Sequence, residues 1–384
     1  MVIGIVAAVI AGVMLGLYAL PGKYVKDFQE ENKWSLFFLL TMFVVPLITT
    51  FALMKGVGEI YAGLETSVLI GMVVSSLFWG VGVMMWGKAI DYIGLSLGFS
   101  LFIGTVLLVG TCIPLFVSGM PPAQIAKLIF TGLGLILLGV FLNGSAGIVR
   151  EKDESKLAAE ENKDGSSDLK DPRKSATTGI AIAVIGGLLA TGFAYANTVG
   201  APRLSELSQA QGNAPWKTAL AVMLPIFLSG GVIMTGYFAW QLTQKKAWGS
   251  FKTPSFGKNT LLIFVMAFFH YAASAIFAYA ASMLGEGGDA IGYAIFNTAC
   301  VVTAIISGLA VGEWTKASGK AKMLLYGSLL CMVGGVLVLA YSKTIKVDDP
   351  VEATAVAVQT LDGNALVGVR PENDSKLNFD PAGA

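Results

Sequence analysis

The sequence predicts an all-α polytopic membrane protein with ten transmembrane helices arranged as two inverted five-helix repeats. Hydrophobic residues make up 55% of the 384 residues, charged residues only 13%, and the mean hydropathy is +0.70. The apolar residues gather in ten stretches, and crossing the hydrocarbon takes roughly 20 apolar residues in a helix. The stretches are continuously apolar, without the period-two alternation of a membrane barrel. Helices are therefore the expected spanning elements.

The ten expected spans follow one another at short intervals, except in the middle of the chain. The first stretch has no basic residues before it and runs directly into an apolar helix, which indicates a first span and not a cleaved signal peptide. The expected spans are 3–20, 34–54, 67–88, 94–117, 125–149, 178–199, 216–241, 259–283, 290–311 and 322–342.

Changes in composition divide the chain into four parts. The segment after the fifth span is dense in Lys, Glu, Asp and Ser, as solvated flexible linkers are. The chain also turns polar and acidic after the last span. The expected parts are a first five-helix repeat (1–149), a charged linker (150–176), a second five-helix repeat (177–345) and a disordered tail (346–384).

The two five-helix parts show a weak internal repeat. The segment Gly4–Leu15 aligns without gaps on Gly179–Ala190, and the second helix of each part contains a proline, Pro46 and Pro225. An odd number of helices per repeat forces the second copy into the membrane upside down. Inverted repeats are typical of transporters whose substrate site lies near the midplane, where the repeats meet.

The placement of positive charge predicts the orientation. With ten spans, 18 Lys and Arg lie in or beside the loops after the odd-numbered spans, against 6 on the opposite side. The positive-inside rule then places the linker in the cytoplasm and both termini outside, in the inner (cytoplasmic) membrane.

No enzyme signature is present, so we expect no catalytic residue, metal or organic cofactor. The sequence lacks a Walker A loop, an HExxH motif and a GxSxG motif, and its single histidine cannot form a metal cluster. The net charge of +1 gives no indication of nucleic-acid binding. The three cysteines lie in apolar stretches and predict no disulfide framework.

Polar groups inside the spans are the first candidates for function, because they are costly there. His270 lies mid-span and could follow a proton gradient, since imidazole titrates near neutrality. A neutral histidine bonded within the bundle is the alternative. Asn197 and Asn297 could bond a polyhydroxylated ligand, or could equally join helices.

Aromatic residues are the second candidates. Trp79 and Trp86 lie seven residues apart on one helical face, and Tyr271 adjoins His270. Aromatic rings that stack on sugar C–H faces are common in carbohydrate sites. Packing or lipid contact is the alternative for this stripe.

Charged residues at helix ends are the third group. Lys23 at the end of the first span could reach the interface, and Lys88 and Asp91 are expected to flank and pair across the turn between the third and fourth spans. Glu313 ends the ninth span. Structural roles are expected for Lys23 and Lys88, whereas Asp91 and Glu313 are also candidates for proton coupling, beside His270.

The sequence resembles the L-rhamnose–proton symporter family of the drug/metabolite transporter superfamily. The similarity covers nearly all spans and is carried by Tyr18–Lys26, Trp79–Thr111, Gly179–Pro225 and Gly308–Trp314. It implies two inverted five-helix halves and sugar uptake driven by protons. Matching motif positions are held by Tyr18, Lys23, Trp79, Gly94, Asn197 and Glu313.

One segment departs from the family pattern. After His270-Tyr271 the chain continues with Ala272, Ala273, Ser274 and Ala275, where the family carries an aromatic, glutamine-bearing segment. A pocket lined by alanines would differ in size and offer fewer donors.

We therefore expect a secondary active transporter that imports a small neutral sugar, such as a rhamnose-like 6-deoxyhexose, with protons by alternating access. Its expected partners are the sugar, the proton and the bilayer, and it would act as a monomer or homodimer. The alternatives are an exporter of drugs or metabolites, an uncoupled facilitator of the same superfamily, or a membrane protein that does not transport.

Overall fold

The computed structural model describes residues 2–161, 176–285 and 287–345, and within these ranges the chain is helical with no strand. Ten helical segments are long and apolar enough to cross a membrane, which confirms the predicted number of spans. They are Val2–Tyr24, Glu30–Leu53, Thr66–Ile93, Leu97–Val117, Ala123–Glu154, Thr177–Ala210, Pro215–Gln244, Phe256–Met283, Gly288–Ala310 and Gly319–Ser342.

Several spans are built from more than one helix, and short helices join others. Before the gap in the description lie α1 (Val2–Leu17), a 3₁₀ turn (Leu20–Tyr24), α2 (Glu30–Leu39), a π-helical turn (Leu40–Val44), α3 (Val45–Leu53), α4 (Val57–Ala62), α5 (Thr66–Ile93), α6 (Leu95–Val117) and α7 (Ala123–Glu161). After it lie α8 (Ala176–Ala190), α9 (Gly192–Ala210), a 3₁₀ turn (Pro215–Lys217), α10 (Thr218–Gln244), a 3₁₀ turn (Ala247–Phe251), α11 (Phe256–Met283), α12 (Gly288–Ala310) and α13 (Gly319–Ser342).

The second span contains the π-helical turn because of Pro46. Proline has no N–H to donate to the carbonyl four residues before it, and its ring clashes with that carbonyl. The chain widens locally, and the N–H of Val45 bonds the carbonyl oxygen of Leu40, five residues back. Such insertions are frequent at functional sites.

The sixth span is interrupted between α8 and α9. The hydroxyl of Thr191 donates to the carbonyl oxygen of Leu188 at 2.6 Å, and the next residue is Gly192. A β-carbon at Gly192 would lie 2.0 Å from the carbonyl oxygen of Ser75 on α5. Only glycine permits this approach of the two backbones.

The first helix before the gap in the described residues and the first helix after it each pack against helices from the other side of that gap. The first helix, α1, packs against α11 and α12, and α8 packs against α5 and α6. A β-carbon at Gly12 would lie 2.5 Å from the Phe296 carbonyl oxygen, and one at Gly187 would lie 2.8 Å from that of Phe102. Small residues allow this close packing, which lipid alone would not drive. Spans distant in sequence therefore share one core.

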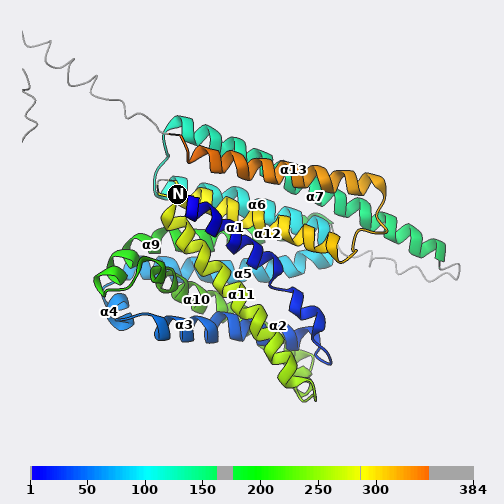
Figure 1. Ribbon diagram of the computed structural model, residues 1–384. Helices are drawn as coiled ribbons and strands as arrows, with labels where there is room; N and C mark the ends of the chain where they lie inside the picture. Colours follow the sequence, from blue (N-terminus) through cyan, green and yellow to red (C-terminus); the bar gives the residue numbers. More distant parts are fainter. Residues whose placement is uncertain (1, 162–175, 286, 346–384) are drawn as a thin grey trace, which may run out of the picture. The chain divides into compact units, whose positions relative to one another are not determined.

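The helices α7 and α13 form a pair and run side by side along most of their length, as Figure 1 shows. Glycines lie at the contact: a β-carbon at Gly132 would be 3.0 Å from the Gly335 carbonyl oxygen, and one at Gly335 would be 2.6 Å from that of Gly132. This pair packs mainly through α6 and α12.

Two expectations about helix ends are wrong. The residues from Arg150 to Glu161 continue α7 as helix instead of starting a flexible linker. An ion pair between Arg150 and Glu154 (3.3 Å), one helical turn apart, supports this extension. The Asp153 carboxylate also accepts from the Ser318 N–H at 3.2 Å. The remainder of the expected linker (162–175) and the tail (346–384) lie outside the described residues.

The second wrong expectation concerns the turn between the third and fourth spans. The helix α5 continues to Ile93 and α6 begins at Leu95, so Lys88 and Asp91 lie in the last turns of α5 instead of flanking a loop. Gly94 alone makes the break with φ of +81°, a conformation that residues with a β-carbon rarely adopt. Gly94 therefore lies between the two helices.

Candidate transport site

His270 lies in the middle of α11, and three aromatic rings surround its imidazole. The centroid of the imidazole ring is 5.1 Å from that of Tyr18, which directly follows α1, 5.5 Å from that of Phe37 of α2 and 5.8 Å from that of Phe227 of α10. All three contacts are edge-to-face, with interplanar angles of 68°, 84° and 67°. Edge-to-face contacts are a favoured arrangement of aromatic rings. The imidazole is therefore held between spans 1, 2 and 7.

The π-helical turn of the second span supplies the polar contact to this histidine. The Thr41 hydroxyl lies 3.2 Å from Nδ1 of His270 and 3.1 Å from the carbonyl oxygen of Ala267, one turn earlier on α11. Thr41 is fully buried, so water does not compete for its hydroxyl.

The rings continue from Phe227 toward the third and sixth spans. Trp79 lies 5.6 Å from Phe227 and 5.2 Å from Phe193 of α9, and Tyr271 stands edge-on to Phe227 at 5.1 Å. Gly230 makes room for the indole, since a β-carbon there would lie 2.5 Å from Cε3 of Trp79. We call this set the aromatic core; it consists of Tyr18, Phe37, Trp79, Phe193, Phe227, His270 and Tyr271.

The aromatic core unites four predicted site residues, Tyr18, Trp79, His270 and Tyr271. It draws them from spans 1, 3 and 8, and adds rings from spans 2, 6 and 7. No predicted site residue comes from spans 2 and 7. They enter it because α10 packs on α5, and because α10 and α11 both pack on the helices of span 2.

Several oxygens near the middle of the bundle are buried without a hydrogen-bond partner among the described residues. Asn197 is 2% exposed, and its side-chain carbonyl oxygen accepts no bond. The same holds for the hydroxyl groups of Thr198 and Thr298. A buried polar group without a partner costs about 1–3 kcal/mol. Such groups are candidates for bonds to a hydroxylated ligand.

Two other predicted site residues have their neighbours elsewhere. Asn297 donates through Nδ2 to the carbonyl oxygen of Tyr293 in its own helix at 2.9 Å. Trp86 stacks on Phe102 at 5.8 Å and lies 6.0 Å from Phe99, both on α6. Trp79 and Trp86 lie seven residues apart on α5, and their rings contact different helices.

The predicted charged residues lie at helix ends. Lys23 and Glu313 form an ion pair at 3.3 Å, with side chains 52% and 49% exposed. Lys88 and Asp91 are exposed on the last turns of α5, and a β-carbon at Gly94 would lie 3.1 Å from the Glu151 carboxylate.

A further ion pair ties α2 to the end of α10. Lys245 donates to the Glu31 carboxylate, and this hydrogen bond raises the pKa of the Lys245 ammonium group above its ordinary value. This ion pair lies beyond the apolar part of α10, because Lys245 follows the last residue of that helix.

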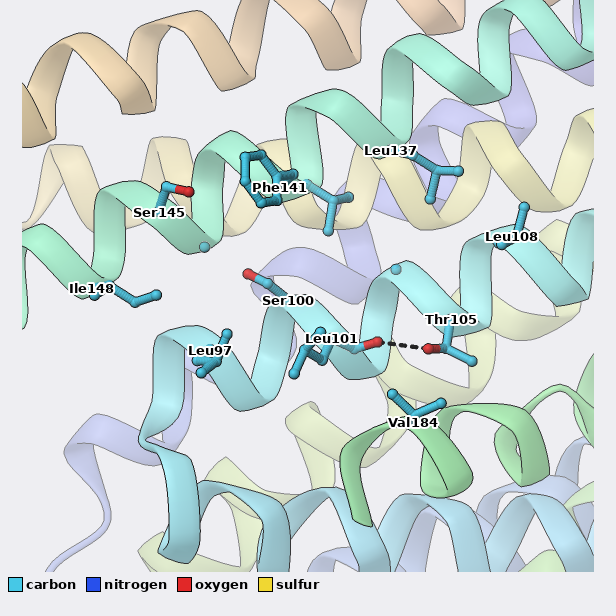
Figure 2. A pocket seen from close by; sticks show the side chains of 13 residues that line it. Leu97, Ser100, Leu101, Thr105, Leu108, Leu137, Phe141, Ser145, Ile148 and Val184 are labelled. Atoms are coloured by element: carbon cyan, nitrogen blue, oxygen red, sulfur yellow. Dashed lines mark hydrogen bonds between the residues drawn. The ribbon is translucent and has the colours of Figure 1, made fainter. Parts of the chain in front are cut away.

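An open cavity of about 480 Å³ lies away from this core, between α6, α7 and α8. Figure 2 shows that its lining is aliphatic apart from Phe141 and the hydroxyls of Ser100, Thr105 and Ser145. The Thr105 hydroxyl donates to the Leu101 carbonyl oxygen in its own helix. Phe141 is 69% exposed. This lipid-facing groove contains no predicted site residue.

Sequence reasoning missed Phe37, Thr41, Phe193 and Phe227. A phenylalanine in an apolar span gives no signal that distinguishes core from lipid contact. Thr41 had one signal, since it lies five residues before Pro46 and prolines widen the preceding turn.

Ten bilayer-length helices around an aromatic core with buried hydrogen-bonding groups define a multi-pass membrane protein. The family model of the L-rhamnose-proton symport protein matches residues 1–344, and the chain belongs to this family. This membership confirms the resemblance that the sequence motifs indicated. It also identifies the chain as a transporter and not an enzyme.

Curated relatives agree with the family model. The L-rhamnose-proton symporters of Escherichia coli O1:K1 / APEC and of Shigella dysenteriae serotype 1 (strain Sd197) are similar to this chain. Each is 25% identical over 322 residues, covering 82% of this chain and 89% of the relative.

Proposed function

We propose that this protein imports a small neutral sugar of the 6-deoxyhexose type together with protons, across the inner membrane. Its family and the names of its relatives support coupled sugar transport. The single observation that carries the proposal is the aromatic core, in which the only histidine lies among rings from spans 1, 2 and 7.

The chemistry of the aromatic core suits a neutral sugar. The faces of Trp79 and Tyr18 can stack on C–H faces of a pyranose ring. The unpaired side-chain oxygen of Asn197 can bond its hydroxyl groups. The predicted charged residues lie at helix ends, so a cationic substrate would find no carboxylate in the core. The alanines after Tyr271 leave small apolar surfaces that suit a methyl group better than a hydroxymethyl group.

His270 is the proposed coupling residue. Imidazole exchanges a proton near neutrality, and this one makes edge-to-face contacts with three aromatic rings and lies beside a buried hydroxyl group. Proton uptake at His270 from outside would favour sugar binding, and release inside would follow exit of the sugar. Asp91 and Glu313 stay second candidates at helix ends. The proton is the coupling ion, and no organic cofactor enters the proposal.

Alternating access would use the two interrupted spans. Sites in transporters with inverted repeats are typically formed by discontinuous helices near the midplane. Here the π-helical turn of span 2 lies beside His270, and the break in span 6 lies next to Phe193. The packing of α1 against α11 and α12, and of α8 against α5 and α6, supports two inverted halves. The charge distribution supports a cytoplasmic linker and external termini, and the monomer or homodimer expectation is unchanged.

The test is uptake of labelled L-rhamnose and a panel of hexoses and deoxyhexoses into proteoliposomes with an inward proton gradient. We expect gradient-driven accumulation of a 6-deoxyhexose, and His270→Ala should abolish accumulation while exchange of sugar across the membrane continues. The matched control is Phe268→Ala, two residues away on α11 and 44% exposed.

Three results would count against the proposal. Accumulation by His270→Ala equal to the wild type would remove His270 as coupling residue. Sugar uptake indifferent to the proton gradient would indicate a facilitator. Drug or metabolite efflux without sugar uptake would indicate an exporter.

A further inference from the structure

The contact between Thr41 and His270 has a chemical consequence beyond packing. A threonine hydroxyl has one proton to donate and lone pairs to accept with. Thr41 lies within bonding distance of two groups, the Ala267 carbonyl oxygen at 3.1 Å and His270 Nδ1 at 3.2 Å. A carbonyl oxygen only accepts, so Thr41 must give its proton to Ala267 if both bonds exist together.

The hydroxyl then has only a lone pair for the imidazole, and Nδ1 must be the donor. Which nitrogen of a neutral histidine carries the proton is set by the bond that the other nitrogen makes. If Thr41 donated to Nδ1 instead, its bond to Ala267 would be lost. The arrangement that satisfies both distances is the Nδ1–H tautomer.

The second nitrogen of the imidazole, Nε2, is available to accept a proton or a hydrogen bond. No hydrogen bond of His270 Nε2 to any described residue is present. The rings of Tyr18, Phe37 and Phe227 contact the imidazole edge-to-face and restrict its rotation about χ2. A ring flip that would exchange the positions of its nitrogen and carbon atoms is therefore opposed by packing as well as by Thr41.

We propose that Thr41 is a positioning residue that fixes His270 in the Nδ1–H tautomer and so makes Nε2 the proton-accepting atom of the site. Nε2 is then the atom that takes up the coupling proton, or that accepts a hydrogen bond from a sugar hydroxyl in the neutral state. The role of Nε2 in transport rests on the proposed function; the tautomer itself does not.

The sequence explains how Thr41 reaches this place. It lies in the π-helical turn that precedes Pro46, and that turn rotates the residues before the proline relative to a regular helix. Thr105 on α6 is the comparison, because its hydroxyl bonds the Leu101 carbonyl oxygen of its own helix at 2.8 Å. Thr41 instead bonds across to α11.

Nitrogen-15 NMR of histidine-labelled protein in lipid nanodiscs tests the tautomer directly. The chain contains a single histidine, so a full-length protein with a histidine-free affinity tag gives one pair of imidazole signals. We expect a protonated, hydrogen-bonded Nδ1 and an unprotonated Nε2 in the neutral form. A predominantly Nε2-protonated ring would overturn the proposal.

Three variants separate positioning from packing. Thr41→Val keeps the shape and removes the hydroxyl; we expect a mixture of tautomers and a loss of proton-driven accumulation of about tenfold, the effect of one buried hydrogen bond. Thr41→Ser should restore both the tautomer and the transport. Thr105→Val, which removes a hydroxyl that bonds its own helix in the groove, should change neither.

The outcomes distinguish this inference from the proposed function. If the Thr41→Val variant keeps the Nδ1–H tautomer of the wild type, the inference is wrong, even where sugar transport is intact. If the wild-type protein has the Nδ1–H tautomer but shows no proton-driven accumulation of sugar, the proposed function is wrong. The positioning role of Thr41 would still hold in that case.

Discussion

The aromatic core around His270 and the lipid-facing groove between α6, α7 and α8 are both apolar regions inside the same bundle, and they differ in how their polar groups are used. In the groove, the Thr105 hydroxyl bonds its own helix, and the side chains around it are mostly aliphatic. In the core, Thr41 bonds across to α11, and rings from several spans meet one titratable side chain.

The difference teaches that open volume alone does not define a site. The groove has a volume of about 480 Å³ but offers a ligand only three hydroxyl groups and no charge. The core is closely packed, yet it holds an imidazole, two tyrosines and a tryptophan where helices from both ends of the chain meet. Apolar surface facing lipid is already in a suitable solvent, whereas polar groups in a bundle are retained for bonding or function.

The largest expected effect tests the packing side of this comparison. Gly192→Ala would place a β-carbon 2.0 Å from the Ser75 carbonyl oxygen, a backbone atom that cannot rotate away. We expect a loss of stability of about 3 kcal/mol or failure to fold, since overpacking at a fixed contact is not relieved by rotamer changes. Thermal unfolding in detergent, followed by size-exclusion chromatography, measures it.

The groove supplies the control for this substitution. A β-carbon at Gly104 would lie 3.6 Å from Cγ1 of Val140, an ordinary contact. Gly104→Ala should therefore leave the unfolding temperature close to that of the wild type. Equal destabilisation by both variants would show that the core is packed no more tightly than the groove.

The next effect concerns transport. Trp79→Ala removes a ring that contacts both Phe193 and Phe227, and we expect sugar uptake to fall by at least about tenfold, as loss of an aromatic anchor commonly costs more than 1 kcal/mol. Trp79→Phe should keep part of the activity. Initial rates over a range of sugar concentrations in proteoliposomes provide the measurement.

Phe141 provides the matching change in the groove. It is 69% exposed, so Phe141→Ala removes a large ring from the lipid side. Uptake by this variant should remain within a factor of two of the wild type. If Phe141→Ala were as damaging as Trp79→Ala, the groove and not the aromatic core would be the better candidate site.

The sequence could predict the spans and part of the core, for definable reasons. Span length and apolarity follow from the bilayer, and unusual residues such as His270 and Trp79 stand out against apolar neighbours. Phe227 and Phe141 do not, because the same residue type serves the core and the lipid face; only packing separates a ring that is 0% exposed from one that is 69% exposed.

The helical extension of α7 could not be predicted from composition alone. A run dense in Lys, Glu and Asp has the composition of a linker, but Arg150 and Glu154 are spaced as a helical ion pair. The Arg150 guanidinium also lies 4.8 Å from the centroid of the Trp314 ring, from the loop before α13. That contact joins residues far apart in sequence, so no local pattern shows it.

The smallest expected effect lies at the helix ends, where Lys23 and Glu313 pair. Both side chains are about half exposed, and exposed ion pairs contribute only about 0.2–1 kcal/mol because solvent screens them. We expect Glu313→Gln to lower proton-driven uptake by less than about fivefold, and the double exchange Lys23→Glu with Glu313→Lys to recover much of that loss. Uptake assays with each single and the double variant give the coupling between the two charges.

A different outcome would relocate proton coupling from the core to the membrane surface. If Glu313→Gln abolished accumulation while exchange continued, and the double exchange did not rescue it, the carboxylate itself would be needed as a proton acceptor. A pair that acts only by mutual attraction is restored when its two charges are exchanged; a coupling carboxylate is not, because lysine cannot replace it as an acid near neutral pH. The exchange experiment therefore separates an electrostatic contact from a proton site at the same residue.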